Sequence, residues 1–371
     1  MPNSIHILCL KRFLGVGLLL VTIVGCRNKT PNFYSESDYR VVPKIDAHIH
    51  VSAKENLFEE QAKQNGFQLL NIVVGGSSEP DTLRKRFDFR ISKKKEFPDL
   101  YEVATSFSVK EWDQPHWATK TISRLEEDVK KGAIAVKVWK NIGMVLKDST
   151  GQLVMVDHPK LDTIFNYLAQ KDIPVIGHLG EPKNCWLPLD EMTVANDSIY
   201  YSEHPQYHMY KQPEFPSYQD QIDARDRMLE KHPDLTFIGA HLGSLEWSVD
   251  ELANRLDRFP NMSVDMAARI GQIFYQTIED REKVRDFFIK YQDRILYATD
   301  LGYGGKKPVD EQIKLMQETW KLDWEFLVTD KILTNYRVSQ PFQGLKLPRE
   351  VVDKIYYGNA QKWLNMFADK D

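Results

Sequence analysis

Short apolar segments of strand length alternate along this chain with amphipathic stretches of helical period. Eight such segments can be marked, and a strand–helix alternation repeated eight times predicts a parallel sheet. Eight βα units can close into a (β/α)8 TIM barrel, in which the C-terminal ends of all strands meet at one rim. The expected strands are residues 43–50, 67–75, 101–109, 133–139, 173–178, 235–241, 262–266 and 294–300. The expected helices include residues 119–131, 160–171, 218–231, 247–259 and 279–291.

Histidine or aspartate residues stand at the ends of four of these segments. The first segment ends in His48 and His50, which side-chain alternation places on one face of a strand. His178, His241 and Asp300 end the fifth, sixth and eighth segments. Taken singly, a histidine after a strand is often a hydrogen-bonded loop residue, and an aspartate there is often a helix N-cap. Imidazole and carboxylate groups gathered at one rim instead predict a site for a divalent metal.

This arrangement resembles the amidohydrolase superfamily, and within it the amidohydrolase-related ("amidohydrolase 2") branch, which also contains decarboxylases, lactonases and hydratases. The phrases Phe-Ile-Gly-Ala-His-Leu-Gly at 237–243 and Ile-Tyr-Tyr-Gly-Asn-Ala at 355–360 also resemble that branch. The resemblance runs from about residue 44 to 364 and implies one metal-dependent barrel over residues 42–368. The metal ligands that it implies are His48, His50, His178 and Asp300.

The resemblance also implies a reaction on a small-molecule substrate. A water activated by a divalent ion, with zinc expected, would attack the carbonyl of an amide, ester or lactone. Asp300 would accept the proton of that water and return it to the leaving group, while His241 would donate a hydrogen bond to the oxyanion. In binuclear members the position of His241 binds a second ion instead. The same ligands also fit non-oxidative decarboxylation of an aromatic or enol acid, and a non-catalytic metal-binding lipoprotein is a third alternative.

Three further residues are expected to contact the substrate. Lys137 and Trp139 share one face of the fourth segment, and a lysine inside an apolar strand is costly to bury unless it is paired. Lys137 has three alternatives: a carbamate that bridges two ions, a contact to an anionic substrate or carboxylate, or an ordinary solvated end. Arg269 follows the seventh segment and is expected to bind a substrate carboxylate, with a structural salt bridge as the alternative.

Two acidic residues near strand ends are assigned supporting roles. Asp46 lies two residues before His48, so alternation turns it to the face of the metal ligands, where it either supports them or closes the barrel. Glu246 lies where the helix after the sixth segment opens and is expected to be a charge partner of that helix N-terminus.

The longest expected connection is an insertion after the fifth strand, residues 179–218, which is rich in tyrosine and histidine. A loop of this length is usually functional, as a lid or a substrate-binding loop. The alternative is a cover packed on the barrel or an interface, as in a homo-oligomer.

The N-terminus indicates where the protein works. Lys11 and Arg12 precede an apolar run, residues 13–24, that suits a signal peptide better than a membrane span. The run ends in Ile-Val-Gly-Cys, which resembles the lipobox of bacterial lipoproteins and implies lipidation of Cys26. We therefore expect a signal peptide at 1–25, a tether at 26–41 and a lipid anchor that holds the enzyme in the bacterial cell envelope, facing the periplasm or the exterior. A plain membrane anchor is the alternative.

Composition agrees with one catalytic domain. A net charge of −4 leaves no basic patch for nucleic acid. Of the three cysteines, Cys9 leaves with the signal peptide and Cys26 is lipidated, so Cys185 remains without a partner for a disulfide. A lone thiol without a companion motif is most often inert.

Overall fold

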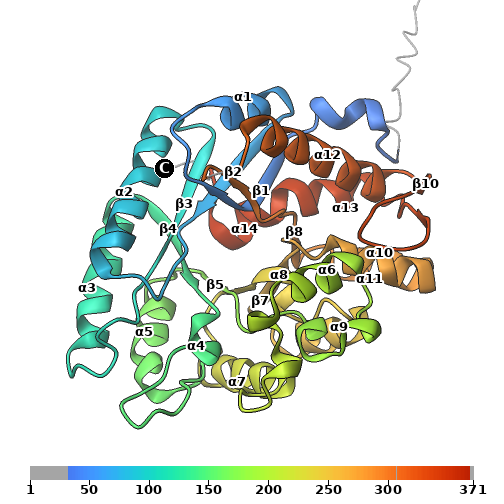
Figure 1. Cartoon of the computed structure of the whole chain (residues 1–371). Coiled ribbons are helices and arrows are strands. Elements are labelled where there is room, and N and C mark those ends of the chain that lie inside the picture. Colours follow the sequence, from blue (N-terminus) through green and yellow to red (C-terminus); the bar gives the residue numbers. More distant parts are fainter. Residues whose placement is uncertain (1–31, 306, 368–371) are drawn as a thin grey trace, which may run out of the picture. The chain divides into compact units, whose positions relative to one another are not determined.

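Nine parallel strands form a curled sheet in the middle of the fold, with helices around the outside (Figure 1). The structure is a computed structural model that describes residues 32–305 and 307–367; the predicted signal peptide and Cys26 lie outside the described residues. The strand order is β8-β7-β6-β5-β4-β3-β2-β1-β9. The strands are β1 Lys44–Val51, β2 Phe67–Ile72, β3 Tyr101–Ser106, β4 Ala133–Val138, β5 Val175–Gly177, β6 Phe237–Gly239, β7 Met262–Asp265, β8 Ile295–Leu296 and β9 Leu301–Tyr303.

The eighth predicted strand is divided between β8 and β9. β8 pairs with β7, β9 pairs with β1, and both belong to one stretch of chain. Between them, the Ala47 N–H donates to the Tyr297 carbonyl (3.0 Å) and the Asp300 N–H donates to the His48 carbonyl (2.8 Å). The stretch therefore contacts both ends of the sheet, and this α/β architecture is consistent with a TIM-like barrel.

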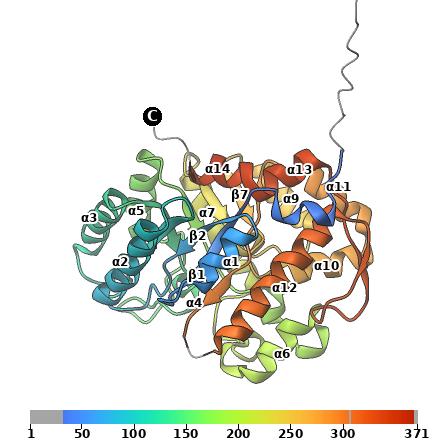
Figure 2. The ribbon, with the colours of Figure 1, turned by 90° about the horizontal axis from the view of Figure 1, so that it is seen from above.

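The expected helices are confirmed, with ends that differ by up to two residues. Helix α12, which follows β9, is the longest helix among the described residues and crosses one side of the sheet (Figure 2). No helix among the described residues has both the length and the apolar character needed to cross a membrane. The helices are α1 Leu57–Gln64, α2 Pro80–Glu96, α3 Trp117–Lys130, α4 Asn141–Met144, α5 Pro159–Gln170, α6 Ala195–Glu203, α7 Tyr218–Lys231, α8 Ala240–Gly243, α9 Val249–Arg258, α10 Ile270–Glu279, α11 Arg281–Lys290, α12 Val309–Val328, α13 Arg349–Asp353 and α14 Asn359–Leu364.

A bulge in β1 decides which residues of that strand face the site. Its register against β2 shifts between Asp46 and Ile49. Before the bulge, Ile45 and Ala47 pack in a cluster with residues of other strands, such as Ile72. After the bulge, Ile49 packs in the larger cluster, which includes helix residues such as Trp320. Because an extra residue in a strand reverses the alternation of faces, Asp46 does not share a face with His48 and His50, and that expectation is wrong.

Asp46 instead holds the two ends of the sheet together. Its carboxylate accepts hydrogen bonds from the Thr299 N–H (3.0 Å) and hydroxyl (2.6 Å), and from the Trp320 indole of α12 (3.0 Å). The barrel-closing alternative is the one that the structure supports.

The connection after β5 is folded rather than structureless. It contains α6 and four single-turn 3-10 helices: η2 Lys183–Trp186, η3 Leu189–Glu191, η4 Pro205–Tyr207 and η5 Met209–Lys211. Cys185 is buried here, and burial raises the pKa of its thiol to about 12, so the thiol is protonated and inert at neutral pH.

The described part of the predicted tether, residues 32–41, packs against the folded body. It contains the 3-10 helix η1 Glu36–Arg40. The Trp324 indole donates to the Ser35 carbonyl (3.1 Å), and the Tyr34 hydroxyl donates to Asp353 (2.6 Å). These contacts join residues 32–41 to the same compact unit as the sheet. A short antiparallel pair, β10 Ile332–Leu333 and β11 Phe342–Gln343, and the π-helix η6 Lys354–Gly358 complete the fold.

Candidate metal centre and active site

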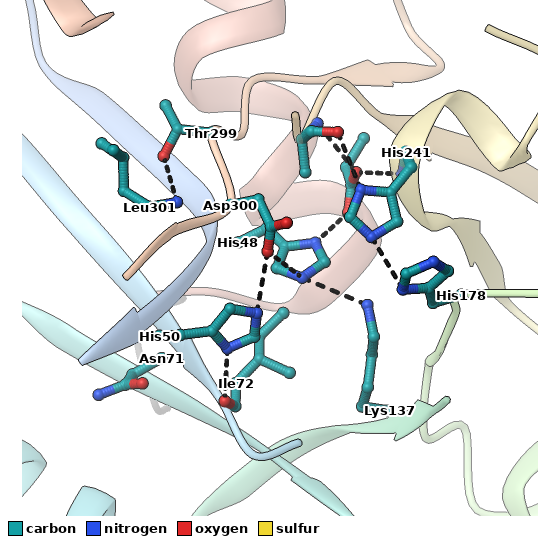
Figure 3. Close-up of polar contacts among 12 residues, drawn as sticks. His48, His50, Asn71, Ile72, Lys137, His178, His241, Thr299, Asp300 and Leu301 are labelled. Atoms are coloured by element: carbon teal, nitrogen blue, oxygen red, sulfur yellow. Dashed lines mark hydrogen bonds and ion pairs between the residues drawn. The ribbon is translucent and has the colours of Figure 1, made fainter. Parts of the chain in front are cut away.

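The side chains of His48, His50 and Asp300 converge at the C-terminal ends of the strands (Figure 3). One carboxylate oxygen of Asp300, Oδ1, lies 3.0 Å from His50 Nε2 and 3.6 Å from His48 Nε2. A tetrahedral ion with bonds of about 2.0–2.1 Å separates its ligand atoms by about 3.3–3.4 Å. The spacing of these three atoms therefore fits ligands of a single metal ion.

The opposite nitrogens of both imidazoles are already occupied. His48 Nδ1 donates to Asp265 (2.8 Å), and His50 Nδ1 donates to the Ile72 carbonyl (3.0 Å). Each ring therefore turns the lone pair of Nε2 toward Asp300. Lone pairs and a carboxylate that face one another repel unless a cation lies between them, so the donor set fits a bound metal.

Burial keeps three of the imidazoles in the neutral form, which is the form that binds metal. It lowers the pKa of His48, lowers that of His178 well below its usual value, and lowers that of His241 to about 3. Asp300 behaves in the opposite way: burial raises its pKa, but His50 and the other imidazoles outweigh that effect and hold the pKa well below its usual value. At neutral pH the rings of His48, His178 and His241 are thus neutral, and the Asp300 carboxylate is ionised.

Asp265 is a site residue that the sequence analysis missed. Its carboxylate accepts from His48 Nδ1 and from the backbone N–H groups of His241 (2.7 Å) and Ala267 (3.1 Å). Burial raises the pKa of Asp265, but the interaction with His48 dominates and lowers it to about 2. An acidic residue at the inward-facing end of the apolar strand β7 was the available signal.

His178 and His241 face each other instead of joining the three-residue group. His178 Nδ1 lies 3.1 Å from His241 Nε2. His241 Nδ1 donates to the Ala267 carbonyl (2.9 Å), so its Nε2 carries a lone pair and accepts. A neutral His241 in this tautomer cannot donate to an oxyanion from Nε2, which argues against the predicted donor role. It fits a ligand or a proton acceptor.

The backbone at His241 and Asp300 is left-handed, with φ of 59° and 64°. Such conformations cost about 1–3 kcal/mol each and collect at functional sites. After β6 the turn depends on two glycines, because a Cβ at Gly239 would lie 2.8 Å from the Gly243 Cα. This close approach explains the Gly-Ala-His-Leu-Gly phrase and turns the chain so that His241 faces the site.

Lys137 points into the site from β4, with its ammonium nitrogen 3.3 Å from His48 Nε2. Its side chain is 1% exposed, so the solvated alternative is wrong. Burial lowers the pKa of Lys137 to about 8, while Asp265 and Asp300 oppose that shift. The contact that its ammonium makes is to His48, so the contact to an anionic substrate or a carboxylate and the bridging carbamate both stay predictions.

A cavity of about 450 Å³ opens above these residues, with His178, His241 and Asp300 in its wall. Arg269 also lines it; its Nε is buried without a hydrogen-bond partner among the described residues. Burial lowers the pKa of the Arg269 guanidinium, but Asp197 and Glu246 raise it by more, so the group is cationic. Arg269 is thus placed to bind an anion.

The structure does not bring Trp139 to the cavity. β4 ends at Val138, so the alternation that pairs Trp139 with Lys137 stops one residue earlier. The cavity wall contains Lys140 instead, in an ion pair with Glu181.

Glu246 differs from its predicted role as well. It is buried, accepts the Lys183 N–H (2.8 Å), and Ser248 caps the helix that follows. Glu246 therefore supports the wall of the cavity near Arg269.

A family model described as amidohydrolase matches residues 45–366. The chain belongs to this amidohydrolase family. A search of curated proteins found no match. Among solved structures, 2,6-dihydroxybenzoate decarboxylase from Rhizobium is similar in fold, with a TM-score of 0.54, 14% identity and coverage of 87% of this chain and 99% of that one. The 5-carboxyvanillate decarboxylase from Sphingomonas paucimobilis has a TM-score of 0.50, 9% identity and coverage of 87% and 99%.

Proposed function

We propose that this protein is a metal-dependent hydrolase that cleaves an amide, ester or lactone of a small organic acid. The convergence of His48 Nε2, His50 Nε2 and Asp300 Oδ1 beside a cavity of about 450 Å³ carries the proposal. When bound, a divalent cation lowers the pKa of a coordinated water and polarises a carbonyl oxygen. A nitrogen-rich set with one carboxylate suits Zn²⁺, and one ion is expected, or two if Lys137 is a carbamate.

Three residues of the chain would act beside the metal, in proton transfer, water orientation and substrate binding. Asp300 is ionised, so it can take a proton from water and return it to the leaving group. His241, with Nε2 as an acceptor, orients the attacking water or binds a second ion. Arg269 offers N–H donors to a carboxylate of the substrate and so fixes its position in the cavity.

Non-oxidative decarboxylation of an aromatic or enol acid is the second candidate. Two solved structures of similar fold are decarboxylases, and a cationic Arg269 in the cavity suits an acid substrate equally well. In this reaction the carboxylate would leave as carbon dioxide, and a protonated group of the site would deliver a proton to the carbon that held it.

Product analysis separates the two reactions. Purified metal-loaded protein would be incubated with panels of lactones, amides and hydroxybenzoic acids in H₂¹⁸O, with Asp300→Asn as the matched control. Label in a new carboxyl group supports hydrolysis, and carbon dioxide release supports decarboxylation. If no compound of any panel is converted, a non-catalytic metal-binding protein would be favoured.

We also propose that the protein is lipid-anchored in the cell envelope through Cys26. The apolar run at 13–24 followed by Gly25 and Cys26 supports this proposal. Cells fed labelled fatty acid should label the wild type but not Cys26→Ser. Incorporation of label into the Ser variant, with retention in the membrane fraction, would contradict the anchor.

A further inference from the structure

The catalytic cavity continues into a second, outer lobe. The outer lobe has a volume of about 310 Å³, and its walls are α12 and the chain around residue 336. In Figure 2, α6 and the lower part of α12 lie at the same edge of the view. The two lobes share four wall residues: Leu315, Thr319, Tyr336 and Arg337. A substrate that fills both lobes is longer than one that the inner cavity alone would hold.

Arg337 is held in place where the two lobes meet. The backbone N–H of Arg337 donates to Asn335 Oδ1 (3.1 Å), and its backbone carbonyl accepts from the Ala195 N–H at the start of α6 (2.8 Å). Its aliphatic stem lies against Gly271 of α10, where a Cβ would come within 2.9 Å of Arg337 Cδ. Gly271 is the second residue of α10, so it lies in the first turn of that helix. Here it provides the space that the arginine stem occupies.

The guanidinium of Arg337 has unused bonding capacity. Within residues 32–305 and 307–367, no hydrogen bond or ion pair to it is found, and the ring of Tyr336 lies 5.3 Å away. The acids of the inner lobe have other partners: Glu181 pairs with Lys140, and Asp197 accepts from Asn184 (2.9 Å). The two acids in the wall of the outer lobe also pair with lysines of α12, Glu318 with Lys314 (3.8 Å) and Glu325 with Lys321 (3.7 Å).

Asp323, behind the lobe on α12, accepts from the Tyr297 hydroxyl through Oδ2, and its Oδ1 has no hydrogen-bond partner among the described residues. Burial raises the pKa of Asp323 to about 7 and the charge of Arg337 opposes that rise, although no ion pair within 4 Å joins the two side chains in the described part of the chain.

We propose that the outer lobe is a second acid-binding subsite, in which Arg337 binds a distal carboxylate of the substrate. This inference rests on the proposed function, because the first carboxylate is the one that Arg269 binds beside the metal ligands. A guanidinium binds a carboxylate through two parallel N–H···O bonds, which selects anions by geometry as well as charge. The exposed faces of Leu315 and Tyr336 suit an apolar or aromatic body between the two acids. The substrate is therefore a small organic diacid.

Calorimetric titration of the metal-loaded full chain tests the subsite without requiring turnover. The probes are straight-chain dicarboxylates from glutarate to azelate, compared with the monoacid hexanoate. At least one diacid should bind the wild type more tightly than hexanoate. Arg337→Ala should weaken that diacid about 10-fold or more, the usual size of a lost charged hydrogen bond, and leave hexanoate within about twofold.

Two variants make the result specific. Arg337→Lys keeps the charge and should retain part of the diacid preference, which excludes misfolding as the cause. Lys331→Ala removes an exposed cation that pairs with Glu36 and is not in the wall of either lobe, and it should change neither affinity. Equal weakening of both probes, or no diacid preference in the wild type, overturns the subsite. Loss of hexanoate binding in Arg269→Ala would still support the inner acid site, so the two proposals fail separately.

Discussion

Two lysines, Lys44 and Lys137, are fully buried in strands of the curled sheet, and their surroundings differ. Lys44 begins β1, at the end of the sheet opposite the site; its ammonium donates to the Val42 carbonyl (2.7 Å) and lies 4.9 Å from the ring centres of Tyr39 and Phe67. Lys137, near the C-terminal end of β4, faces His48 Nε2 at 3.3 Å beside the cavity.

Burial alone does not distinguish these two lysines. It lowers the pKa of Lys44 to about 7 and that of Lys137 to about 8. They differ in what their donors meet: Lys44 is satisfied by carbonyls within a packed aromatic box, whereas Lys137 meets the atoms that would bind a metal. A functional site is therefore marked by bonding capacity that the fold leaves open toward a cavity, rather than by buried charge.

Substitution of Asp300 should lower turnover more than any other change considered, whereas substitution of a structural acid should not. Asp300→Asn removes the ionised carboxylate that two imidazoles face, so turnover should fall by at least about 10³-fold. Asp323→Asn is the control, because Asp323 is buried and its carboxylate accepts from the Tyr297 hydroxyl instead of facing the imidazoles. Steady-state kinetics on the substrate found by product analysis would check both. Comparable losses in the two variants would remove the distinction between the regions.

His241→Asn should have the next largest effect. Loss of the Nε2 acceptor should slow turnover by about 10²-fold, the usual contribution of a positioned acid–base group. One bound ion should remain, since His241 is not among the three converging ligands. Elemental analysis alongside kinetics checks the two quantities together. Unchanged turnover would exclude His241 from the reaction.

The smallest effect concerns stability. Lys44→Met leaves the carbonyls of Tyr39 and Val42 without their donor, which should lower the free energy of unfolding by about 1–3 kcal/mol. Metal content and turnover should not change. Denaturant unfolding measures the first quantity, and Lys137→Met is the counterpart, expected to lose turnover. Loss of bound metal in Lys44→Met would contradict the purely structural role of this lysine.

The difference in the free energy of unfolding between the wild type and Lys44→Met should change with pH in a definite direction. Between pH 7 and pH 10 the unfolded chain protonates Lys44 while the folded chain does not, because burial lowers its folded pKa to about 7. Wild-type stability should therefore rise with pH relative to Lys44→Met, by at most about 1.4 kcal/mol per pH unit. A parallel pH dependence in the two proteins would show that Lys44 does not titrate as described.

The strand ends and the residues on them could be predicted from sequence because both signals are local. A short apolar run and the polar residue that ends it stand together, as at His178 and Asp300. The bulge in β1 could not be read this way, since it depends on the register against β2, and the facing of Asp46 was wrong for that reason. Arg337 gave no signal either, because it lies in an irregular segment after α12 and depends on a glycine of another helix.

The metal content of the wild-type protein, purified without chelator, is the direct test of a metal site at His48, His50 and Asp300. We expect about one divalent ion per chain, or two with a carbamate at Lys137. His50→Ala should lose most of the metal, because His50 Nε2 is one of three converging ligand atoms. Wild-type protein without any bound metal, or a His50→Ala variant with undiminished metal, would contradict that site.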